Sequence, residues 1–319
     1  MPHRGGAKTI SELGEDSLID RLGDLLPAEP RWVRIGRGVD DCAALDLGSR
    51  YWTLVTCDAQ VEGTHFRRDW IDAQTLGRRA AAVNLSDIAA MGGEPRAAVV
   101  SLHLPRSLDV TYYDALMRGL GARLAEFGAA LVGGNLARAP RSISIDVTLV
   151  GHVRAERCVR RNGARVGDRI LVTGDPGESA AGLARLRRGW RTGGRLRTRF
   201  LDPEPRVAAG RLLAAGGVTA MIDTSDGIAA DLARLCAASA VGALVDRARL
   251  PLSSALRRAS TQLGKRAWEF ALHGGEDYEL LCTAPPSRVS RLQQRLLAAA
   301  NLRLTDIGEI GRASCRERV

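Results

Sequence analysis

The sequence has no long apolar run. Within its 319 residues, no stretch approaches the roughly 20 consecutive apolar residues that a transmembrane helix requires. The first eleven residues are polar and lack the apolar centre of a secretion signal. We therefore expect no membrane partner and a cytoplasmic location.

Paired cysteines are also missing. Six cysteines are scattered along the chain without any CxxC pair, at Cys42, Cys57, Cys158, Cys236, Cys282 and Cys315. This spacing argues against a disulfide framework and against a zinc site, and it predicts reduced, mostly buried side chains.

Lysine is nearly absent, and arginine supplies almost all of the positive charge. Lys8 and Lys265 are the only lysines in a chain whose formal net charge is +10. The densest basic stretch, residues 185–199, contains one tryptophan and no helix-turn-helix, zinc-finger or RNA-binding signature. An arginine-rich genome would give the same balance, so we predict no nucleic-acid partner.

Several familiar catalytic signatures are lacking as well. There is no GxxxxGK[ST] phosphate-binding loop and no GxGxxG segment after a strand. No Ser-His-Asp or Cys-His arrangement stands out. If the chain handles phosphates, its chemistry is expected to depend on metal ions and not on a lysine or a nucleophilic triad.

What is present favours a mixed α/β (α+β) protein of two domains. Hydrophobic residues make up 45% of the chain, enough to bury substantial cores. Strand patterns at 52–56, 97–102, 142–153 and 169–173 alternate with helical patterns at 73–91, 108–127 and 179–186. We expect an N-terminal domain over residues 1–155 and a C-terminal domain over 156–308, with a surface connection extending to about residue 198. No repeat of fixed period is found.

The last eleven residues, 309–319, read EIGRASCRERV. This string is similar to the translation of a common DNA-sequencing adapter, although a basic helical tail would have the same composition. We interpret it as a non-native tail and expect it to lie outside the fold.

The strongest chemical signal is a set of acidic segments, most of them where strands are expected to end. They are Asp40-Asp41, Thr56-Cys57-Asp58, Asp87, Asp223-Thr224-Ser225-Asp226 and Glu276-Asp277. Carboxylates alone repel a triphosphate, but with magnesium ions between them they become a phosphate-binding site. Phosphoryl transfer needs alignment and positive charge more than covalent help, so these segments predict metal-assisted phosphate chemistry.

Each segment also has a purely structural interpretation. Asp40-Asp41 fits a solvated turn, and Asp223–Asp226 fits the N-cap of a following helix. Asp87 shares a face of an alanine-rich helix with Asn84, where polar residues are harder to explain by packing. His65 fits a packed histidine.

Two glycine pairs, Gly133-Gly134 and Gly274-Gly275, are expected to follow apolar strands. Such pairs allow a ligand to approach the backbone closely, but they also occur in ordinary turns.

Taken together, the segments resemble the thiamine-monophosphate kinase family, within the superfamily of aminoimidazole ribonucleotide synthetase. The matching segments, in family order, are GEDSLIDRL, VDDCAAL, TLVTCDAQVEGTHF, AAVNLSDIAAMGGEPRAAVVSLHLP, LVGGN, RNGARVGDRILVTG, GESAAGL, IDTSDGIAADLARL and GGEDYELL. The resemblance covers nearly the whole chain and is more specific than any single motif.

This resemblance implies direct, in-line transfer of the γ-phosphate of ATP to thiamine monophosphate, giving thiamine diphosphate. It implies several magnesium ions, an N-terminal sheet domain that binds ATP and pairs with its copy in a homodimer, and a C-terminal sheet-and-helix layer domain. The acceptor is already an anion, so no catalytic side chain is expected.

The resemblance also implies roles for individual residues. Magnesium ligands would be Asp41, Thr56, Cys57, Asp58, Asp87, Asp223 and Asp226. Positions near the nucleotide would be Gly134, Asn135, Arg161 and Ser225, and positions near the thiamine phosphate would be His65 and Glu276.

Three departures from the family pattern leave alternatives open. Cys57 replaces a common threonine, Asn135 often corresponds to aspartate, and we expect the segment that helps to enclose the thiamine to be missing beyond Gly308. The alternatives are another ATP-dependent superfamily member with a different small substrate, or a non-catalytic nucleotide-binding relative.

Overall fold

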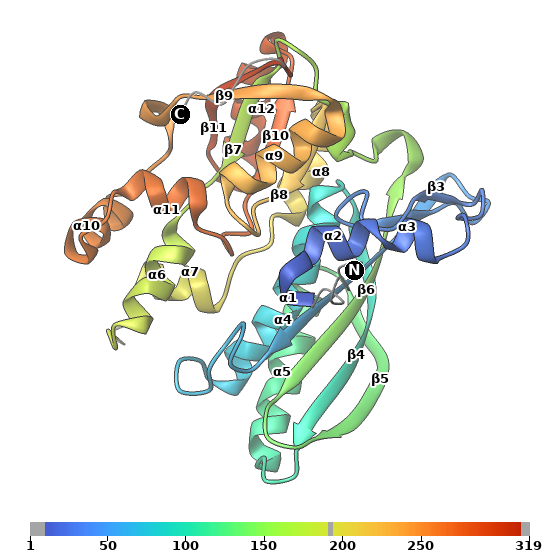
Figure 1. The fold of residues 1–319 in the computed structure, drawn as a ribbon, viewed down its shortest axis with the longest axis vertical. Coiled ribbons are helices and arrows are strands. Elements are labelled where there is room, and N and C mark those ends of the chain that lie inside the picture. Colours follow the sequence, from blue (N-terminus) through green and yellow to red (C-terminus); the bar gives the residue numbers. More distant parts are fainter. Residues whose placement is uncertain (1–9, 191–193, 314–319) are drawn as a thin grey trace, which may run out of the picture.

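The computed structural model describes residues 10–190 and 194–313, and in this part of the chain two separate sheets are found. Figure 1 shows one sheet in the lower half of the molecule and the other in the upper half. The expected mixed α/β architecture is confirmed.

The first sheet has six strands in the order β1-β2-β3-β6-β4-β5. Its strands are β1 (Val33–Ile35), β2 (Ala43–Leu45), β3 (Tyr51–Val61), β4 (Glu94–Pro105), β5 (Ala130–Ala139) and β6 (Ser144–Arg154). All neighbours are antiparallel except β4 and β5, which run parallel. The edge strand β5 is thus separated from β3 by two strands.

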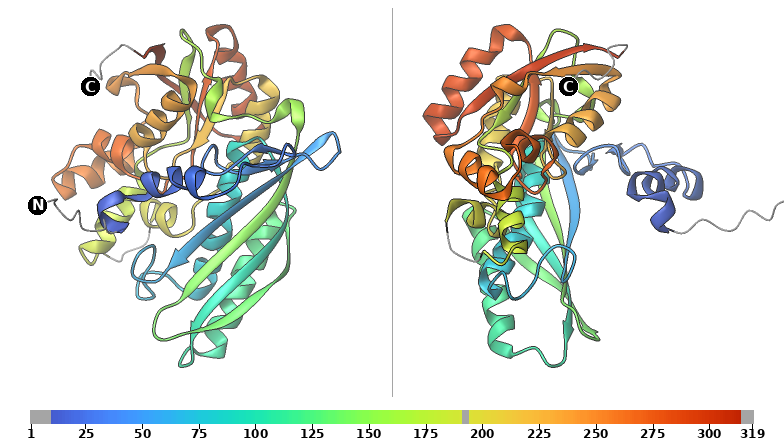
Figure 2. Two further views of the ribbon diagram at one scale, coloured as in Figure 1. Left: turned by 45° about the vertical axis from the view of Figure 1, so that its right-hand side comes forward. Right: turned by 60° about the vertical axis from the view of Figure 1, so that its left-hand side comes forward.

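Two helices, α4 (Ala73–Ala90) and α5 (Val110–Glu126), cover one face of this sheet. Along β6, Ile145, Val147 and Leu149 are buried while the residues between them are partly exposed, which confirms the predicted alternation. Asp72 and Asp109 cap the two helices by accepting hydrogen bonds from backbone amides of their first turns. The opposite face of the sheet is not covered by these helices (Figure 2).

The short helices α1 (Ile10–Leu13), α2 (Glu15–Asp20) and α3 (Leu22–Leu25) precede the first sheet. In the right-hand view of Figure 2 they extend away from the body, on the side opposite α4 and α5. No helix of the described residues is both long and apolar enough to cross a membrane.

The second sheet has five strands in the order β8-β10-β7-β11-β9. Its strands are β7 (Arg169–Thr173), β8 (Ala220–Asp223), β9 (Val241–Val245), β10 (Leu280–Ala284) and β11 (Leu304–Arg312). The helices of this half are α6 (Glu178–Arg187), α7 (Arg195–Leu201), α8 (Val207–Gly216), α9 (Ile228–Ser239), α10 (Ser254–Leu263), α11 (Ala267–His273) and α12 (Pro286–Ala300). Short 3-10 turns occur at Ala155–Arg157, Arg161–Gly163 and Arg247–Arg249.

One hydrophobic core joins the two halves. It includes residues of α4 and β6 from the first half and of α8, α12 and β10 from the second. Gly210 of α8 lies so close to α4 that a Cβ there would collide with the carbonyl oxygen of Ala89. Helix α4 is therefore packed between both sheets, and its polar residues can reach both.

Four local expectations were wrong. Strand β3 continues through Val61, so Cys57 and Asp58 lie inside a strand and not in a loop. Gly133-Gly134 lies within β5, and Gly274-Gly275 follows helix α11 instead of a strand. Helix α7 begins at Arg195, inside the stretch expected to be a surface connection.

The expected division at residue 155 falls in the 3-10 turn between β6 and β7. The expectation that 309–319 lies outside the fold was wrong for its first four residues. Glu309–Arg312 completes β11, pairs with β9, and buries Ile310 completely. Residues 314–319 lie outside the described part of the chain.

Candidate metal and phosphate site

Three aspartates from distant parts of the chain converge where the two sheets meet. Asp41 comes from the bend between β1 and β2, Asp87 from α4, and Asp223 from the end of β8. One carboxylate oxygen of each lies within 4.8 Å of the others. The structure thus brings together three of the seven predicted metal ligands.

This cluster lacks enough positive charge for its carboxylates. Burial raises the pKa of Asp41, Asp87 and Asp223 above the ordinary value, and the neighbouring carboxylates raise the pKa of Asp87 and Asp223 further. Oδ2 of Asp41 is buried and has no hydrogen-bond partner among the described residues. Oxygen ligands with an unused lone pair and excess negative charge fit a magnesium ion well.

Hydrogen bonds from neighbouring side chains hold the carboxylates in place. Thr56 donates to Asp87 at 2.5 Å, and Ser86 donates to Asp223 at 2.5 Å. The side-chain oxygen of Asn84 accepts from the backbone amide of Asp58 at 3.1 Å. Because Asn84, Ser86 and Asp87 all belong to α4, this helix orients acids on both sheets.

Arg161 is the cation next to the cluster. Its guanidinium bonds Asp41, and its backbone amide donates to Asp40 at 3.1 Å. Burial, and then the charge of Asp41, raise the pKa of Asp40 to about 7. The Nε of Arg161 is buried and makes no hydrogen bond among the described residues, although it lies 3.7 Å from Oδ1 of Asp40, so the guanidinium is held by both aspartates.

Cys57 and Asp226 lie differently from the three central acids. Side chains alternate along β3, and the exposed thiol of Cys57 accepts a hydrogen bond from Thr148 of β6, at 3.3 Å. Thr56 and Asp58 belong to the alternate set of β3, beside α4, so only the backbone of Cys57 remains close to them. The carboxylate of Asp226 is about half exposed and pairs with Arg234.

The loop that carries Glu276 lies against the loop that follows β8. The amide of Glu276 donates to the carbonyl of Ser225 at 2.7 Å. Glu276 and Tyr278 both have positive φ, at 64° and 51°. The carboxylate of Glu276 pairs with Arg79, a residue of α4 that the sequence did not single out.

The remaining predicted positions do not join the cluster within one chain. His65 follows β3, and its Nδ1 accepts the backbone amide of Val61 at 3.0 Å. Gly134 and Asn135 are exposed on the edge strand β5. Strands are roughly 4.8 Å apart, so β5 lies about 14 Å across the sheet from β3.

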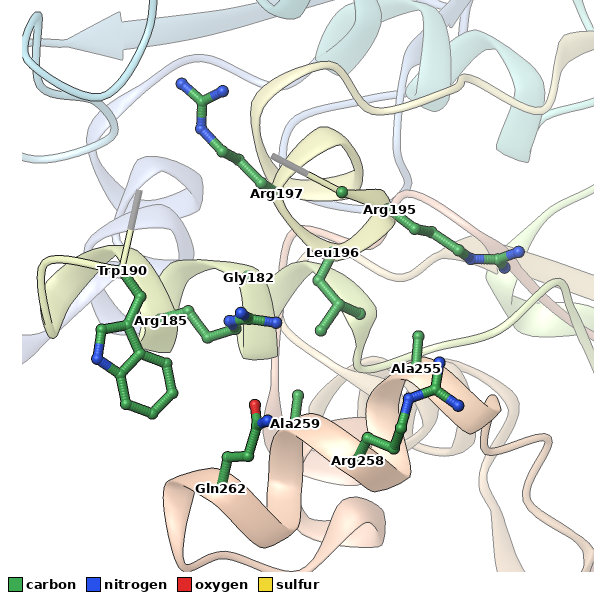
Figure 3. A pocket seen from close by; sticks show the side chains of 11 residues that line it. Gly182, Arg185, Trp190, Arg195, Leu196, Arg197, Ala255, Arg258, Ala259 and Gln262 are labelled. Atoms are coloured by element: carbon green, nitrogen blue, oxygen red, sulfur yellow. The ribbon is translucent and has the colours of Figure 1, made fainter. Parts of the chain in front are cut away.

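Away from this cluster, a hollow of about 180 Å³ lies between α6, α7 and α10. Figure 3 shows Arg185, Arg258 and Gln262 around it, while Arg197 points away. None of the predicted site residues lines this hollow. It is basic, in contrast to the carboxylate site, and contributes no ligand to it.

Sequence reasoning missed Arg79 and Ser86. The available signal was the burial of α4, since a helix that is apolar on nearly all sides has no packing reason to carry Arg79, Asn84, Ser86 and Asp87. That reasoning was applied to Asn84 and Asp87 only.

Two family descriptions match the sequence. Residues 39–153 match the family "AIR synthase related protein, N-terminal domain", and residues 165–316 match "AIR synthase related protein, C-terminal domain". The chain is 40% identical to the thiamine-monophosphate kinase of Salmonella typhimurium over 277 residues, which are 85% of this chain and 83% of the relative. It is 39% identical to that of Mycobacterium tuberculosis, over 86% of this chain and 81% of the relative.

The fold is also similar to those of solved structures. One, described as AaThiL complexed with AMPPCP and TMP, has a TM-score of 0.85 and 34% identity, covering 97% of this chain and 94% of that one. Another, the thiamine-monophosphate kinase from Stenotrophomonas maltophilia, has a TM-score of 0.77 and 36% identity, covering 92% of this chain and 93% of that one. The matched families, relatives and folds agree throughout the chain. The chain therefore belongs to the thiamine-monophosphate kinase family.

Proposed function

We propose that the protein transfers the γ-phosphate of ATP to thiamine monophosphate, producing thiamine diphosphate and ADP. The observation that carries the proposal is the convergence of Asp41, Asp87 and Asp223 beside Arg161. The relatives named above are thiamine-monophosphate kinases, and one related structure holds AMPPCP and TMP. An ATP-consuming reaction also fits the cytoplasmic location expected from the sequence.

The metal proposed for this site is magnesium, in more than one copy. Asp41, Asp87 and Asp223 would be its central ligands, with Asp58, Asp226, Thr56 and the backbone of Cys57 as further ligands. Bound magnesium would neutralise phosphate oxygens and polarise the transferred group. The excess of buried carboxylate charge supports this part of the proposal.

The residues of the chain align the two substrates. A phosphate oxygen of thiamine monophosphate forms the new bond to the γ-phosphorus, while the bond from this phosphorus to the β–γ bridging oxygen breaks and ADP leaves. The attacking group is already ionised, so no side chain needs to remove a proton. Arg161 and Ser225 would contact the nucleotide, and His65 and Glu276 would lie on the side of thiamine monophosphate.

We further propose that the active form is a homodimer in which the uncovered faces of two first sheets meet. Val99 of β4 is exposed on this face, next to the buried Val100, and Val132 and Leu136 are exposed on the neighbouring edge strand β5. Gly134 and Asn135 lie on the same edge of the sheet, distant from the acids of their own chain. A second copy would bring them to a nucleotide held by the first.

The test is to incubate the protein with ATP, magnesium and thiamine monophosphate and to follow thiamine diphosphate and ADP by chromatography. We expect both products in equal amounts, and none from unphosphorylated thiamine, because the acceptor oxygen belongs to a phosphate. ATP binding without either product would support the non-catalytic relative. ADP formation with another acceptor only would support a different substrate.

A further inference from the structure

Arg79 is the largest side chain that is completely buried in the described part of the protein. It lies in α4, one and a half turns before Asn84. A buried guanidinium is costly unless its donors are matched by acceptors, and removing one partner leaves an uncompensated charge. The hydrogen-bond acceptors around Arg79 therefore determine whether its burial is stable.

These groups come from three separate segments. Nε of Arg79 donates to the side-chain oxygen of Gln60 in β3 at 3.0 Å. One terminal nitrogen bonds the carbonyl of Phe200 at the end of α7, and the other bonds Oε1 of Glu276. The guanidinium also lies 4.8 Å from the centre of the Phe200 ring. Arg79 thus joins the first sheet to two segments of the second half.

The backbone conformation of Glu276 depends on contacts such as the ion pair with Arg79. Its positive φ of 64° is unfavourable for a residue with a side chain, so the loop depends on outside contacts to keep this shape. The backbone is held by Ser225, and the carboxylate is held by Arg79. The side chain nevertheless remains about a quarter exposed, at 25%.

We propose that Arg79 is a positioning residue that fixes the carboxylate of Glu276 for the acceptor substrate. The inference rests on the proposed function, in which Glu276 lies on the side of thiamine monophosphate. Arg79 itself is 1% exposed and cannot touch a ligand, so it acts through Glu276. Because Arg79 binds Oε1, Oε2 would be the oxygen that meets the substrate.

The chain contains a matched control in Arg123. This arginine of α5 is also nearly buried, at 3% exposure, and also ties the first half to the second. It bonds Asp202 at 2.7 Å, the carbonyl of Pro203 at 3.0 Å and Glu204 at 2.9 Å. None of its partners is a predicted site residue, so its loss tests inter-domain anchoring alone.

The kinetic test compares Arg79→Gln, Arg79→Lys and Arg123→Gln. We expect Arg79→Gln to raise KM for thiamine monophosphate about tenfold or more, with KM for ATP within about twofold of wild type. Arg79→Lys keeps the charge but loses the planar guanidinium. Its KM for thiamine monophosphate should lie between those of wild type and Arg79→Gln. Arg123→Gln should lower Tm and leave both KM values unchanged. A rise of KM for thiamine monophosphate in Arg123→Gln as large as that in Arg79→Gln would overturn the proposal.

A double-mutant cycle with Glu276→Ala tests whether Arg79 acts through this carboxylate. In the Glu276→Ala background, adding Arg79→Gln should change KM for thiamine monophosphate by less than about twofold, because the carboxylate that Arg79 binds is already lost. An undiminished tenfold effect would show that Arg79 acts by another route. If Arg79→Gln does not fold, Arg79→Lys is used in both tests.

Amide hydrogen exchange of residues 274–279 gives a readout that needs no turnover. Exchange there should be faster in Arg79→Gln than in wild type, and unchanged in Arg123→Gln. Unchanged exchange in Arg79→Gln would overturn the positioning role even if no substrate were known. A wild-type protein that forms no thiamine diphosphate would instead overturn the proposed function, so the two failures are distinct.

Discussion

Asp87 is a carboxylate on a helix that is otherwise buried almost entirely, and it faces two other acids. We expect Asp87→Asn to remove like-charge repulsion, and so to raise Tm of the metal-free protein by about 2–4 °C. The same change should lower kcat by about two orders of magnitude or more, because a metal ligand is lost. Melting curves with EDTA and with magnesium, together with the kinase assay, check both expectations.

Magnesium should stabilise wild type much more than Asp87→Asn, because binding to the folded state alone raises Tm. The control is Asp114→Asn, at an exposed position of α5, which should respond to magnesium as wild type does. An Asp87→Asn protein with the full magnesium response would contradict the assignment of this ligand.

At the residue scale, the acids could be predicted but their arrangement could not. Asp41, Asp87 and Asp223 each lie in a conspicuous acidic motif, so the sequence was sufficient to select them. Which acids converge depends on how the bend between β1 and β2 and the end of β8 lie against α4, and this is set by the tertiary structure. Arg79 could have been found from the apolar pattern of α4, but one arginine is inconspicuous among so many.

Helix α4 sits close against α5, and glycine makes this approach possible. A Cβ on Gly119 would collide with the carbonyl of Gln74, whereas one on Gly121 would meet nothing within 4 Å. We expect Gly119→Ala to lower the free energy of unfolding by about 1–3 kcal/mol through overpacking. Gly121→Ala should raise it by about 0.5–1 kcal/mol, because alanine favours the helix.

Urea denaturation of the two glycine variants measures these free energies directly. The two positions lie in the same helix, two residues apart, so helix propensity is shared and only the packing differs. Equal effects at both positions would contradict the close contact between α4 and α5.

At the element scale, periodicity predicted the elements well and their ends less well. The alternation in β6 and the alanine-rich pattern of α4 gave these elements nearly to their bounds. The end of β3 was misjudged because Asp58 and Gln60 are polar, yet they alternate with Cys57 and Ala59 in strand fashion. Polar residues of α4 bond both, since Arg79 donates to the side chain of Gln60 and Asn84 accepts from the backbone amide of Asp58. This becomes evident only once the helix is in place.

The stability of the whole molecule should depend on pH because of its buried acids. Burial raises the pKa of Asp40 and Asp231 to about 7 and that of Asp277 to about 8, above the unfolded value of 3.8. The folded state thus holds these protons more tightly, and the stabilisation that they give falls progressively as pH rises above 3.8, until it is lost above about 7 to 8. In EDTA, the free energy of unfolding should be larger at pH 5.5 than at pH 8.

The groups whose pKa is lowered do not alter this expectation. Glu279, whose pKa is about 2, is ionised over this range and contributes a constant amount, as do the other carboxylates of lowered pKa, Asp46, Asp72, Asp109 and Glu126. Burial lowers the pKa of His152, so this residue makes the folded state more stable at high pH than at low pH. It is one group, whereas several buried aspartates have the opposite effect. Magnesium should reduce the difference between the two pH values. Greater stability at pH 8 in EDTA would contradict the charge excess described here.

The proposed homodimer predicts that two inactive variants can restore each other. Asp87→Asn removes a metal ligand from its own site, and Asn135→Arg would disable the nucleotide contact that each chain offers to its partner. In a mixed dimer, both defects fall on one site and the other site is intact. Random mixing gives half mixed dimers with one working site each, so activity should recover to about a quarter of wild type.

The recovery requires exchange of subunits, so the variants are mixed after dissociation and compared with each variant treated alone. Size-exclusion chromatography checks that dimers form again. If the nucleotide contact were made within one chain, each mixed dimer would carry one defect per site and no activity would return. Recovery therefore depends on Asn135 of one copy lying beside Asp87 of the other, which a single chain with this sheet order does not achieve.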